Sequence, residues 1–436
     1  LVPAEEQPYE VPENWVWVRL GAIAEIVTGG TPSKKHPEYY GGNFPFYKPS
    51  DLDQGRLTYD ASEYLSEEGK NVSRIIPKNS TAVCCIGSIG KCGYLMCEGT
   101  TNQQINSAIP KINSLCLYYY LCTENFVQDL LSMASATTIA IVNKSKMESC
   151  AFPLPPLSEQ QRIVERIEEL LAKLDEAKER LQEVADSFAV RKAAILHKAF
   201  TGELTKQWRW ENGVSYESWE EKKGEDFFEY VTSGSRGWAK YYSDKGSIFI
   251  RMGNLNHGTI ELDFSDIQYV ELPDQVEGQR SKLQKNDILI SITADVGMIA
   301  LVREDMDAYI NQHVALARPK NDLYAEFLAW YFVSDDGLQQ MQNKQRGATK
   351  IGLGLQDIRS IILKIPTLPE QHEIVRLIDD LLARERAAQQ AAEQALASID
   401  LMKKSILARA FRGELGTNKA SEASALELLK QVLAEN

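Results

Sequence analysis

Two stretches of the chain are near-copies of one another and decide its architecture. Residues 155–175 read PPLSEQQRIVERIEELLAKLD, and residues 366–386 read PTLPEQHEIVRLIDDLLARER. At a constant offset of 211 and without a gap, residues 155–204 and 366–415 are identical at 20 of 50 positions, and they end in AFTGEL and AFRGEL. A match of this length indicates a duplicated structural unit.

The segments before the two copies are related more loosely. Residues 46–55, FYKPSDLDQG, share a phenylalanine, a leucine and a glycine in register with residues 249–258, FIRMGNLNHG. The dipeptide Asn-Gln that begins at Asn102 recurs at Asn311, and we interpret both as structural amides that bond the backbone. The order is therefore variable, repeated, variable, repeated, which indicates two halves that kept one role and diverged in another.

The repeated segments predict long helices. In the first, apolar residues from Ile163 to Phe188 recur at alternating steps of four and three, the 3.5-residue period of a coiled-coil seam. Each helix should hold roughly 40 residues and span ~60 Å. A capping box opens each helix and a glycine ends it. In the first helix the predicted capping box is Ser158 with Gln161, and the terminating glycine is Gly202. In the second helix they are Thr367 with Glu370, and Gly413.

The seam of the second helix is thin at its centre, where Ala388, Ala392 and Ala395 replace larger residues. Small residues opposite large ones permit close approach, so this seam suits the larger residues between Leu174 and Phe188. We expect the two helices to pack antiparallel within one chain, because a local two-fold axis would relate the duplicated units. Two separate surface helices, or a coiled coil between two chains, remain alternatives.

The variable regions predict mixed structure. Residues 83–86 and 287–292 are short β-rich runs, whereas 117–131 and 324–341 have helix-like apolar spacing and core aromatic residues. The expected fold class is α+β, with two mixed α/β modules joined by two long helices that pack as an antiparallel coiled coil with pseudo-two-fold symmetry. The predicted boundaries are module 1 at 1–154, helical spacer 1 at 155–206, module 2 at 207–365, and helical spacer 2 with a C-terminal tail at 366–436.

The amino-acid composition restricts the classes of protein to which the chain can belong. The 436 residues are 44% hydrophobic and 25% charged, which is typical of a globular chain with about two to four domains. Residues 1–12 lack the pattern of a signal peptide, and no apolar run is long enough for a membrane span, so we expect a cytoplasmic protein without a membrane partner. The seven cysteines lack metal-site spacing and should be reduced thiols.

The sequence offers no constellation for catalysis. Residues 87–91, GSIGK, lack the spacer of a phosphate-binding loop, and no HExxH, GxSxG or GxGxxG pattern occurs. The five histidines are scattered without ligand spacing. We therefore expect neither a catalytic site nor a metal site. Two divergent modules on a rigid spacer suit the reading of two DNA half-sites, which share one face of the duplex when they lie a turn, ~34 Å, apart.

The duplicated segments, their AFTGEL and AFRGEL ends and the variable region before each resemble the specificity subunits of type I restriction-modification systems, and the resemblance covers essentially the whole chain. It implies that the variable regions are target recognition domains, each of which binds one half of a bipartite, asymmetric sequence in double-stranded DNA. It also implies that the helices form an antiparallel coiled coil that docks two methyltransferase subunits, which restriction subunits join.

The same resemblance implies a non-catalytic chain without a cofactor of its own. S-adenosylmethionine, and ATP with magnesium, would serve the methyltransferase and restriction subunits, and the methylated base would be adenine. A coiled-coil adaptor that touches no DNA is the alternative. A fused nuclease or methyltransferase is disfavoured, because the chain lacks a catalytic tetrapeptide of the DPPY type.

The net charge of −13 argues against DNA binding by bulk electrostatics. By segment it is −4 for 1–154, −1 for 155–206, −6 for 207–365 and −2 for 366–436. Contacts to phosphate should therefore be local, and the isolated chain should bind DNA weakly.

Loop residues that could contact DNA are polar or basic. Arginines read guanine, asparagine reads adenine, and lysines more often hold phosphate. The candidates for DNA binding are Thr31, Lys34, Lys35, Lys48, Ser50, Lys144, Lys146, Arg236, Arg251, Asn254, Lys344, Arg346 and Lys350.

Overall fold

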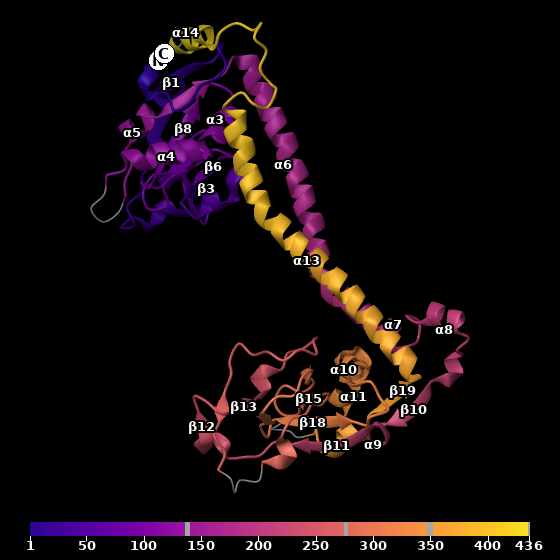
Figure 1. The fold of residues 1–436 in the computed structure, drawn as a ribbon. Coiled ribbons are helices and arrows are strands. Elements are labelled where there is room, and N and C mark those ends of the chain that lie inside the picture. The colour runs from indigo at the N-terminus through magenta and orange to yellow at the C-terminus, as the bar shows by residue number, and fades with distance from the viewer. Residues whose placement is uncertain (136–139, 274–277, 347–351, 435–436) are drawn as a thin grey trace. The chain divides into compact units, whose positions relative to one another are not determined.

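A computed structural model describes residues 1–135, 140–273, 278–346 and 352–434 (Figure 1). The chain divides into two compact units. Unit 1 comprises Leu1–Gln182 with Gln394–Asn436, and unit 2 comprises Glu183–Glu393. Each unit thus combines one variable region with parts of both repeated helical segments.

Short strands form the sheets of unit 1: β1 (Val16–Arg19), β2 (Ala24–Thr28), β3 (Tyr40–Tyr47), β4 (Glu63–Leu65), β5 (Thr81–Cys84), β6 (Cys92–Tyr94), β7 (Thr100–Thr101), β8 (Ile105–Pro110) and β9 (Ala151–Leu154). One sheet has the order β2-β8-β5-β6 with antiparallel neighbours. A second has the order β4-β3-β7, in which β3 and β7 are parallel, and β1 pairs with β9.

The shorter helices of unit 1 are η1 (Ala4–Glu6), α1 (Leu20–Ile23), η2 (Pro37–Tyr39), η3 (Asp51–Leu57), α2 (Glu67–Asn71), α3 (Ser114–Leu121), α4 (Glu124–Met133), α5 (Lys144–Ser149) and α14 (Ala425–Ala434). Helix α3 packs on β5 and β6, and its residues from Cys116 to Leu121 are all buried. The predicted core position of its aromatic run is confirmed. Helix α14 contacts α1, and the Ala425 amide donates to the carbonyl oxygen of Asn14, which precedes β1.

Unit 2 repeats this topology. Its strands are β10 (Glu220–Lys223), β11 (Phe228–Ser233), β12 (Tyr242–Ser243), β13 (Ser247–Ile250), β14 (Tyr269–Val270), β15 (Ile288–Ser291), β16 (Ile299–Leu301), β17 (Ala308–Ile310), β18 (Val314–Pro319) and β19 (Ile362–Ile365). The order β11-β18-β15-β16 reproduces β2-β8-β5-β6, β13 and β17 are parallel as β3 and β7 are, and β10 pairs with β19. The expected α+β fold with two equivalent modules is confirmed.

The shorter helices of unit 2 follow the same plan. They are α8 (Lys206–Asn212), η4 (Tyr216–Ser218), α9 (Gly224–Phe227), η5 (Trp238–Tyr241), η6 (Met252–Asn254), η7 (Gln279–Ser281), α10 (Ala325–Val333), α11 (Asp335–Asn343) and α12 (Leu355–Arg359). Helix α10 packs on β16, and its residues from Ala325 to Phe332 are buried. It therefore supplies the core of unit 2 as α3 does in unit 1.

The repeated segments form α6 (Leu157–Asp186), α7 (Phe188–Phe200) and α13 (Leu368–Ala410). The prediction of one helix through the first repeat is wrong, because the helix breaks at Ser187. The Ser187 hydroxyl donates to the carbonyl oxygens of Glu183 at 2.6 Å and Val184 at 3.2 Å. Such bonds from a side chain to the preceding turn compete with the helical ladder and bend it.

The helix starts differ from the prediction in one place. Helix α6 begins at Leu157 with the amides of residues 159 and 160 bonded to Pro156, so Ser158 lies inside the first turn and is not the cap. Helix α13 begins directly after Thr367, as predicted. The two terminating glycines are confirmed, since Gly202 and Gly413 have φ of 76° and 74°, the left-handed region that glycine adopts without strain.

The long helices pack antiparallel. In unit 1, Lys403 of α13 donates to Asp175 of α6 at 2.5 Å, whereas the earlier Arg162 bonds the later Thr417. The two segments therefore run in opposite directions, side by side (Figure 1). In unit 2, Arg191 of α7 pairs with Glu385 of α13.

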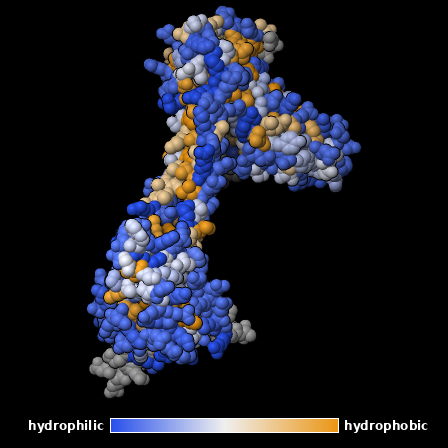
Figure 2. Space-filling model, turned by 90° about the vertical axis from the view of Figure 1, so that its right-hand side faces the viewer, coloured by the Kyte–Doolittle hydropathy of each residue, from blue (hydrophilic) through white to orange (hydrophobic). Residues whose placement is uncertain are grey.

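The predicted seam is only partly buried. Of the three small residues at its centre, Ala392 is 3% exposed and Ala395 is half-buried, whereas Ala388 is exposed; Leu174 and Leu181 are half-buried. Two helices alone cover only one side of each seam residue. Apolar side chains also face solvent, including Val190 at 71% exposure and Leu401 at 67%. Figure 2 shows such apolar surface along the helices.

A buried carboxylate fixes the first turn of each repeat. Glu159 Oε2 accepts hydrogen bonds from Trp15 Nε1 at 2.7 Å and Asn418 Nδ2 at 2.8 Å. Its counterpart in unit 2, Glu370, accepts from Trp219 Nε1 at 3.1 Å and forms an ion pair with Arg209. The segment that follows one long helix thus bonds the glutamate that opens the other.

Two further expectations concern the described residues. All seven cysteines are free thiols. In the ranges that the structure describes, no helix has the length and apolar character needed to cross a membrane.

Candidate nucleic-acid interface

The variable loops of unit 1 gather at one edge of the four-stranded sheet. The last residue of β2, Thr28, pairs with Asn106 near the start of β8, and the end of β5 pairs with Ile105. Because the neighbouring strands are antiparallel, the loops after β2 and β5 and the turn before β8 emerge at the same edge. We call this set of loops the loop edge of unit 1; it comprises residues 29–36, 85–91, 102–104 and 140–143.

Backbone hydrogen bonds hold these loops together. The Gly30 amide donates to the Thr101 carbonyl oxygen at 2.8 Å, and the Asn102 amide donates to the Tyr47 carbonyl oxygen at 3.1 Å. The Val142 amide donates to the carbonyl oxygen of Cys85 at 2.9 Å. The end of β3, which precedes Lys48, therefore also reaches the loop edge.

Unit 2 has an equivalent loop edge, comprising residues 234–241, 292–298, 311–313, 346 and 352–353. The Asn311 amide donates to the Ile250 carbonyl oxygen at 3.0 Å, and the Leu353 amide donates to the Ile292 carbonyl oxygen at 2.9 Å. These bonds repeat the contacts of Asn102 with Tyr47 and of Val142 with Cys85. The topology thus presents two loop edges of one design.

Two positions of this design have the same structural role in both units. The Asn102 Oδ1 atom accepts from the Gln104 amide at 3.1 Å, and Asn311 Oδ1 accepts from the His313 amide at 3.0 Å. This confirms the interpretation for the two asparagines, whereas the glutamine of each dipeptide bonds a side chain: Gln103 accepts from the Thr31 hydroxyl, and Gln312 contacts the His313 ring. A Cβ atom on Gly29 would lie 2.2 Å from a carbonyl oxygen, and one on Gly234 only 1.9 Å, so both turns require glycine.

The structure brings Thr31, Lys34 and Lys35 together in one exposed loop of unit 1. The Thr31 hydroxyl donates to Gln103 Oε1 at 2.5 Å, which links this loop to the turn before β8. Neither lysine forms an ion pair with a described residue. Both ammonium groups are therefore available to an external anion.

Lys144 and Lys146 lie on α5, which directly follows the loop edge. Lys144 is exposed and approaches Glu148 on the same helix at 3.6 Å, whereas Lys146 is half-buried. Partial neutralisation makes Lys144 a weaker candidate for phosphate than Lys34 or Lys35.

Lys48 and Arg251 occupy equivalent sites, and each is neutralised. Lys48 Nζ lies 2.9 Å from Glu63 Oε2, and Arg251 Nη2 lies 2.7 Å from Asp266 Oδ2. The two pairs are related by one offset of 203. Their shared spacing in the sequence is thus explained by a repeated ion pair. Ser50 is exposed one turn further on, before η3.

Asn254 is 3% exposed and its amide is fully engaged. Its Oδ1 atom accepts from the Arg251 amide at 2.9 Å, and its Nδ2 atom donates to the carbonyl oxygens of Asp263 and Asp266. The side chain closes a turn within unit 2, as Asp51 does in unit 1, where Asp51 Oδ2 accepts from the Lys48 amide at 2.7 Å.

The remaining candidates belong to unit 2. Arg236 is exposed in the loop after β11, and neither it nor the half-buried Lys344 forms an ion pair with a described residue. Arg346 is 82% exposed and pairs with Asp357 at 3.0 Å. Lys350 lies outside the described residues.

The prediction omitted one basic residue that the loop edge of unit 2 presents. Lys240 is exposed in η5, directly after the loop that holds Arg236, with its ammonium 4.9 Å from the Tyr241 ring centroid. The sequence could have identified Lys240 as a candidate, because the offset of 205 that aligns Gly29 with Gly234 also aligns Lys35 with Lys240.

Comparisons with known proteins agree with this architecture. A family model described as "Type I restriction modification DNA specificity domain" matches residues 12–186 and 216–395. The chain is 28% identical to the type I restriction enzyme EcoBI specificity subunit of Escherichia coli, over 97% of this chain and 92% of the relative. It is 24% identical to the EcoKI specificity subunit of Escherichia coli strain K12, over 98% and 96%.

Solved structures share the fold. The HsdS subunit from Thermoanaerobacter tengcongensis matches with a TM-score of 0.69 and 19% identity, over 94% of this chain and 99% of that one. A chain from a type I restriction-modification system structure matches with a TM-score of 0.64, over 93% and 100%. The chain belongs to the type I restriction modification DNA specificity family and carries the family's domain twice.

Proposed function

We propose that this chain is the specificity subunit of a type I restriction-modification complex, in which each unit reads one half of a bipartite, asymmetric DNA target. One observation carries the proposal: the same sheet edge in both units collects loops whose backbone design is repeated and whose exposed residues differ. A repeated framework with divergent residues suits two readers of unlike sequences. Membership of the family supports the same conclusion.

The charges at the two loop edges favour local contacts to the phosphate backbone. Lys34 and Lys35 in unit 1, and Arg236 in unit 2, are exposed cations without a carboxylate partner among the described residues. Arg236 is our candidate for bidentate contact with guanine, and the lysines for contact with phosphate. Because the chain carries a net charge of −13, the partner subunits would supply the remaining positive charge.

The long helices would set the spacing of the two half-sites and dock two methyltransferase subunits, which restriction subunits would join. This chain would perform no chemistry. S-adenosylmethionine would serve the methyltransferase subunits, and ATP with magnesium the restriction subunits. Methyl transfer to an adenine requires that the base leave the stack, so the role of this chain would be to position the partner over the correct base. The complex would act in the cytoplasm.

The test is expression of the chain with its methyltransferase subunit in cells that lack other adenine methylation, followed by long-read sequencing. We expect methylated adenines in one two-part motif. The Arg236→Ala variant should relax the requirement in one half of the motif and leave the other half intact. Lys48→Ala is the matched control, because its ion pair with Glu63 serves the fold. Assembly of the complex without motif-specific methylation would favour the adaptor alternative.

A further inference from the structure

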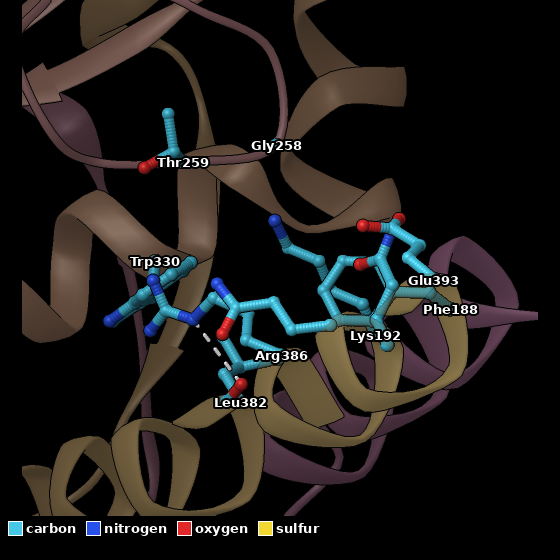
Figure 3. Close-up of a pocket in the computed structure, with 10 residues that line it drawn as sticks. Phe188, Lys192, Gly258, Thr259, Trp330, Leu382, Arg386 and Glu393 are labelled. Atoms are coloured by element: carbon cyan, nitrogen blue, oxygen red, sulfur yellow. Dashed lines mark hydrogen bonds between the residues drawn. The ribbon is translucent and has the colours of Figure 1, made fainter. Parts of the chain in front are cut away.

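Each unit has a pocket where its long helices meet its module. The pocket of unit 2 has a volume of ≈ 360 Å³ and is lined by residues of α7, α13 and α10 and by the Gly258–Thr259 loop (Figure 3). The pocket of unit 1 has a volume of ≈ 560 Å³ and is lined by residues of α6, α13, α3 and η3. Both are open to solvent at the surface of the helix pair.

The two pockets are copies of one another. At the offset of 211 that defines the repeat, four lining residues of one pocket correspond to four of the other, and Arg56 corresponds to Thr259 at the offset of 203. The corresponding pairs are Leu171 with Leu382, Asp175 with Arg386, Tyr119 with Trp330, and Lys403 with Lys192. Both pockets keep the leucine and the aromatic residue of the wall, and both keep the lysine. Asp175 of the unit 1 pocket, however, is replaced by Arg386 in the unit 2 pocket.

In unit 1 every cation that lines the pocket has a carboxylate partner. Lys403 Nζ lies 2.5 Å from Asp175 Oδ1, and Arg56 Nη2 lies 3.2 Å from Glu168 Oε1. The Tyr119 hydroxyl also donates to Glu168 Oε1, at 3.3 Å. This pocket is internally neutral.

In unit 2 the corresponding lysine faces a second cation. Lys192 Nζ lies 5.8 Å from the Trp330 ring centroid, and Arg386 donates through Nε to the Leu382 carbonyl oxygen at 3.3 Å. Neither cation forms an ion pair with a described residue. Burial, and then the positive charge of Arg386, lower the pKa of Lys192. Lys192 extends toward the Gly258–Thr259 loop (Figure 3).

Two carboxylates lie near this pocket, and neither forms an ion pair with Lys192 or Arg386 among the described residues. Glu393 lines the pocket and accepts a hydrogen bond from Gln389 at 3.0 Å. Asp379 takes the position of Glu168, and its pKa is raised by burial and by the negative charge of Glu326, against which Arg303 and Arg386 act. The pocket of unit 2 therefore keeps two cationic heads, of which Arg386 is exposed and Lys192 half-buried.

We propose that the unit 2 pocket receives a carboxylate side chain of the methyltransferase subunit between Lys192 and Arg386, and that its neutral copy in unit 1 does not. The two docking positions for the same partner are then unequal, and the position on unit 2 is the stronger. This inference rests on the proposed function, because it assumes that the partner docks on the long helices.

The shape of the pocket selects the kind of anion. A concave site with the Trp330 and Leu382 side chains in its wall admits a protruding side chain, whereas the phosphates of a duplex lie on a broad convex surface. The planar guanidinium of Arg386 can hold a carboxylate through two parallel hydrogen bonds. Docking would exclude water from the pair, which increases its Coulomb attraction at the cost of desolvation.

The test exchanges the charges of the two pockets. The full-length chain is titrated with its methyltransferase subunit, and native mass spectrometry counts the bound copies at fixed salt. Arg386→Asp gives Lys192 the partner that Lys403 has in unit 1, so we expect binding of the first copy to weaken by about 10-fold or more. Asp175→Arg should strengthen binding of the second copy by a similar factor. Arg384→Asp, an exposed change of equal charge two residues away, is the matched control.

The outcomes are distinct. If the unchanged chain binds no methyltransferase subunit, the proposed function fails. If the unchanged chain binds two copies and Arg386→Asp binds both as tightly, only this inference fails. Binding of inorganic triphosphate at micromolar concentration that Lys192→Met abolishes would overturn the inference in favour of a small-anion site. A loss of duplex DNA affinity in Arg386→Asp with unchanged partner binding would overturn it in favour of a DNA contact.

Discussion

Arg209 Nη1 donates to Glu370 Oε1 at 2.6 Å, and both side chains are almost completely withdrawn from solvent, at 9% and 0% exposure. The same carboxylate accepts from Thr205 and Trp219. The equivalent Glu159 accepts from Trp15, Thr417 and Asn418, and its partners are all neutral. The two units thus place the same acid at the start of each repeat, and in the part of the chain that the structure describes a buried cation pairs with this acid only in unit 2.

This difference predicts unequal stability effects. Glu370→Gln leaves the Arg209 guanidinium buried without its counter-charge, which should cost about 3–5 kcal/mol. Glu159→Gln removes the carboxylate acceptor from neutral donors only, so the free energy of unfolding should fall by about 1–3 kcal/mol. Urea unfolding of the full chain, followed by tryptophan fluorescence, measures both. Equal losses in the two variants would mean that the ion pair adds nothing to the hydrogen bonds around it.

The glycine turns of the loop edges predict a sharp local effect. Gly29→Ala and Gly234→Ala each press a methyl group against backbone carbonyl oxygens, at 2.2 Å and 1.9 Å, so the turn must shift. Overpacking of this kind typically costs about 1–3 kcal/mol. Each variant should also relax the sequence requirement in one half of the methylated motif.

Gly30→Ala is the matched control for Gly29→Ala, since nothing lies within 4 Å of the added methyl group. Thermal unfolding measures the stability change, and long-read sequencing reads the motif. A Gly30→Ala variant as damaged as Gly29→Ala would show that conformation, and not the close approach to Thr101 and Asn102, sets the requirement for glycine.

Free and paired lysines should differ in the salt dependence of DNA binding. The double variant Lys34→Ala, Lys35→Ala removes two exposed cations that have no carboxylate partner among the described residues, so the slope of log K against log salt should fall by about 2 for the assembled complex. Lys48→Ala should change the slope much less, because Glu63 neutralises that lysine at 2.9 Å. Gel shifts across a salt series give both slopes.

The same assay addresses the contribution of the partner. With every segment of the chain net acidic, the isolated chain should bind the duplex far more weakly than the chain with its methyltransferase subunit. Equal affinities at fixed salt would contradict the view that the partner supplies the missing positive charge.

The close approach of the long helices predicts the next effect. Ala392 is 3% exposed in the seam, so Ala392→Leu should overpack it and destabilise the chain by about 1–3 kcal/mol. The neighbouring Ala391 is exposed, and Ala391→Leu should be neutral within about 0.5 kcal/mol. Circular dichroism during thermal unfolding separates the two. A tolerated Ala392→Leu would mean that the helices are not in close contact at this position.

The elements that sequence could predict are those set by local periodicity and by the repeat. The 3.5-residue pattern identified the helices, and Gly202 and Gly413 marked their ends, because a helix stop depends on the local backbone alone. The break at Ser187 escaped prediction, since its sequence counterpart Ser398 lies within the unbroken α13. Ser398 donates to one carbonyl oxygen, that of Ala395, whereas Ser187 donates to two, and the sequence does not show this difference.

The candidate interface was only partly predictable, for a related reason. Whether a loop cation is free depends on distant residues, as Glu63 and Asp266 show for Lys48 and Arg251. The shared offset of 203 indicated equivalence correctly, but it could not distinguish a repeated ion pair from a repeated DNA contact. The ion pair of Lys403, and the absence of one at Lys192 within the described ranges, likewise required the three-dimensional structure.

The C-terminal tail predicts a response to pH. Arg162 of α6 donates to both carboxylate oxygens of Glu422, at 2.9 Å and 2.8 Å, and these bonds hold the pKa of Glu422 below its usual value of 4.5. A lowered pKa in the folded chain means that the pair stabilises the attached tail fully above pH 4.5. That contribution is lost as the pH falls through the folded pKa.

Hydrogen exchange of α14 should therefore accelerate in the wild-type chain as the pH falls below about 4.5, after correction for the intrinsic rate. Glu422→Gln should exchange faster already at neutral pH and respond less to acid, because it lacks the titrating carboxylate. Glu427→Gln, which removes an exposed acid of the same tail paired with Lys430, is the matched control. If Glu422→Gln retains the acid response of the wild type, another group holds the tail, and the pair with Arg162 does not anchor it.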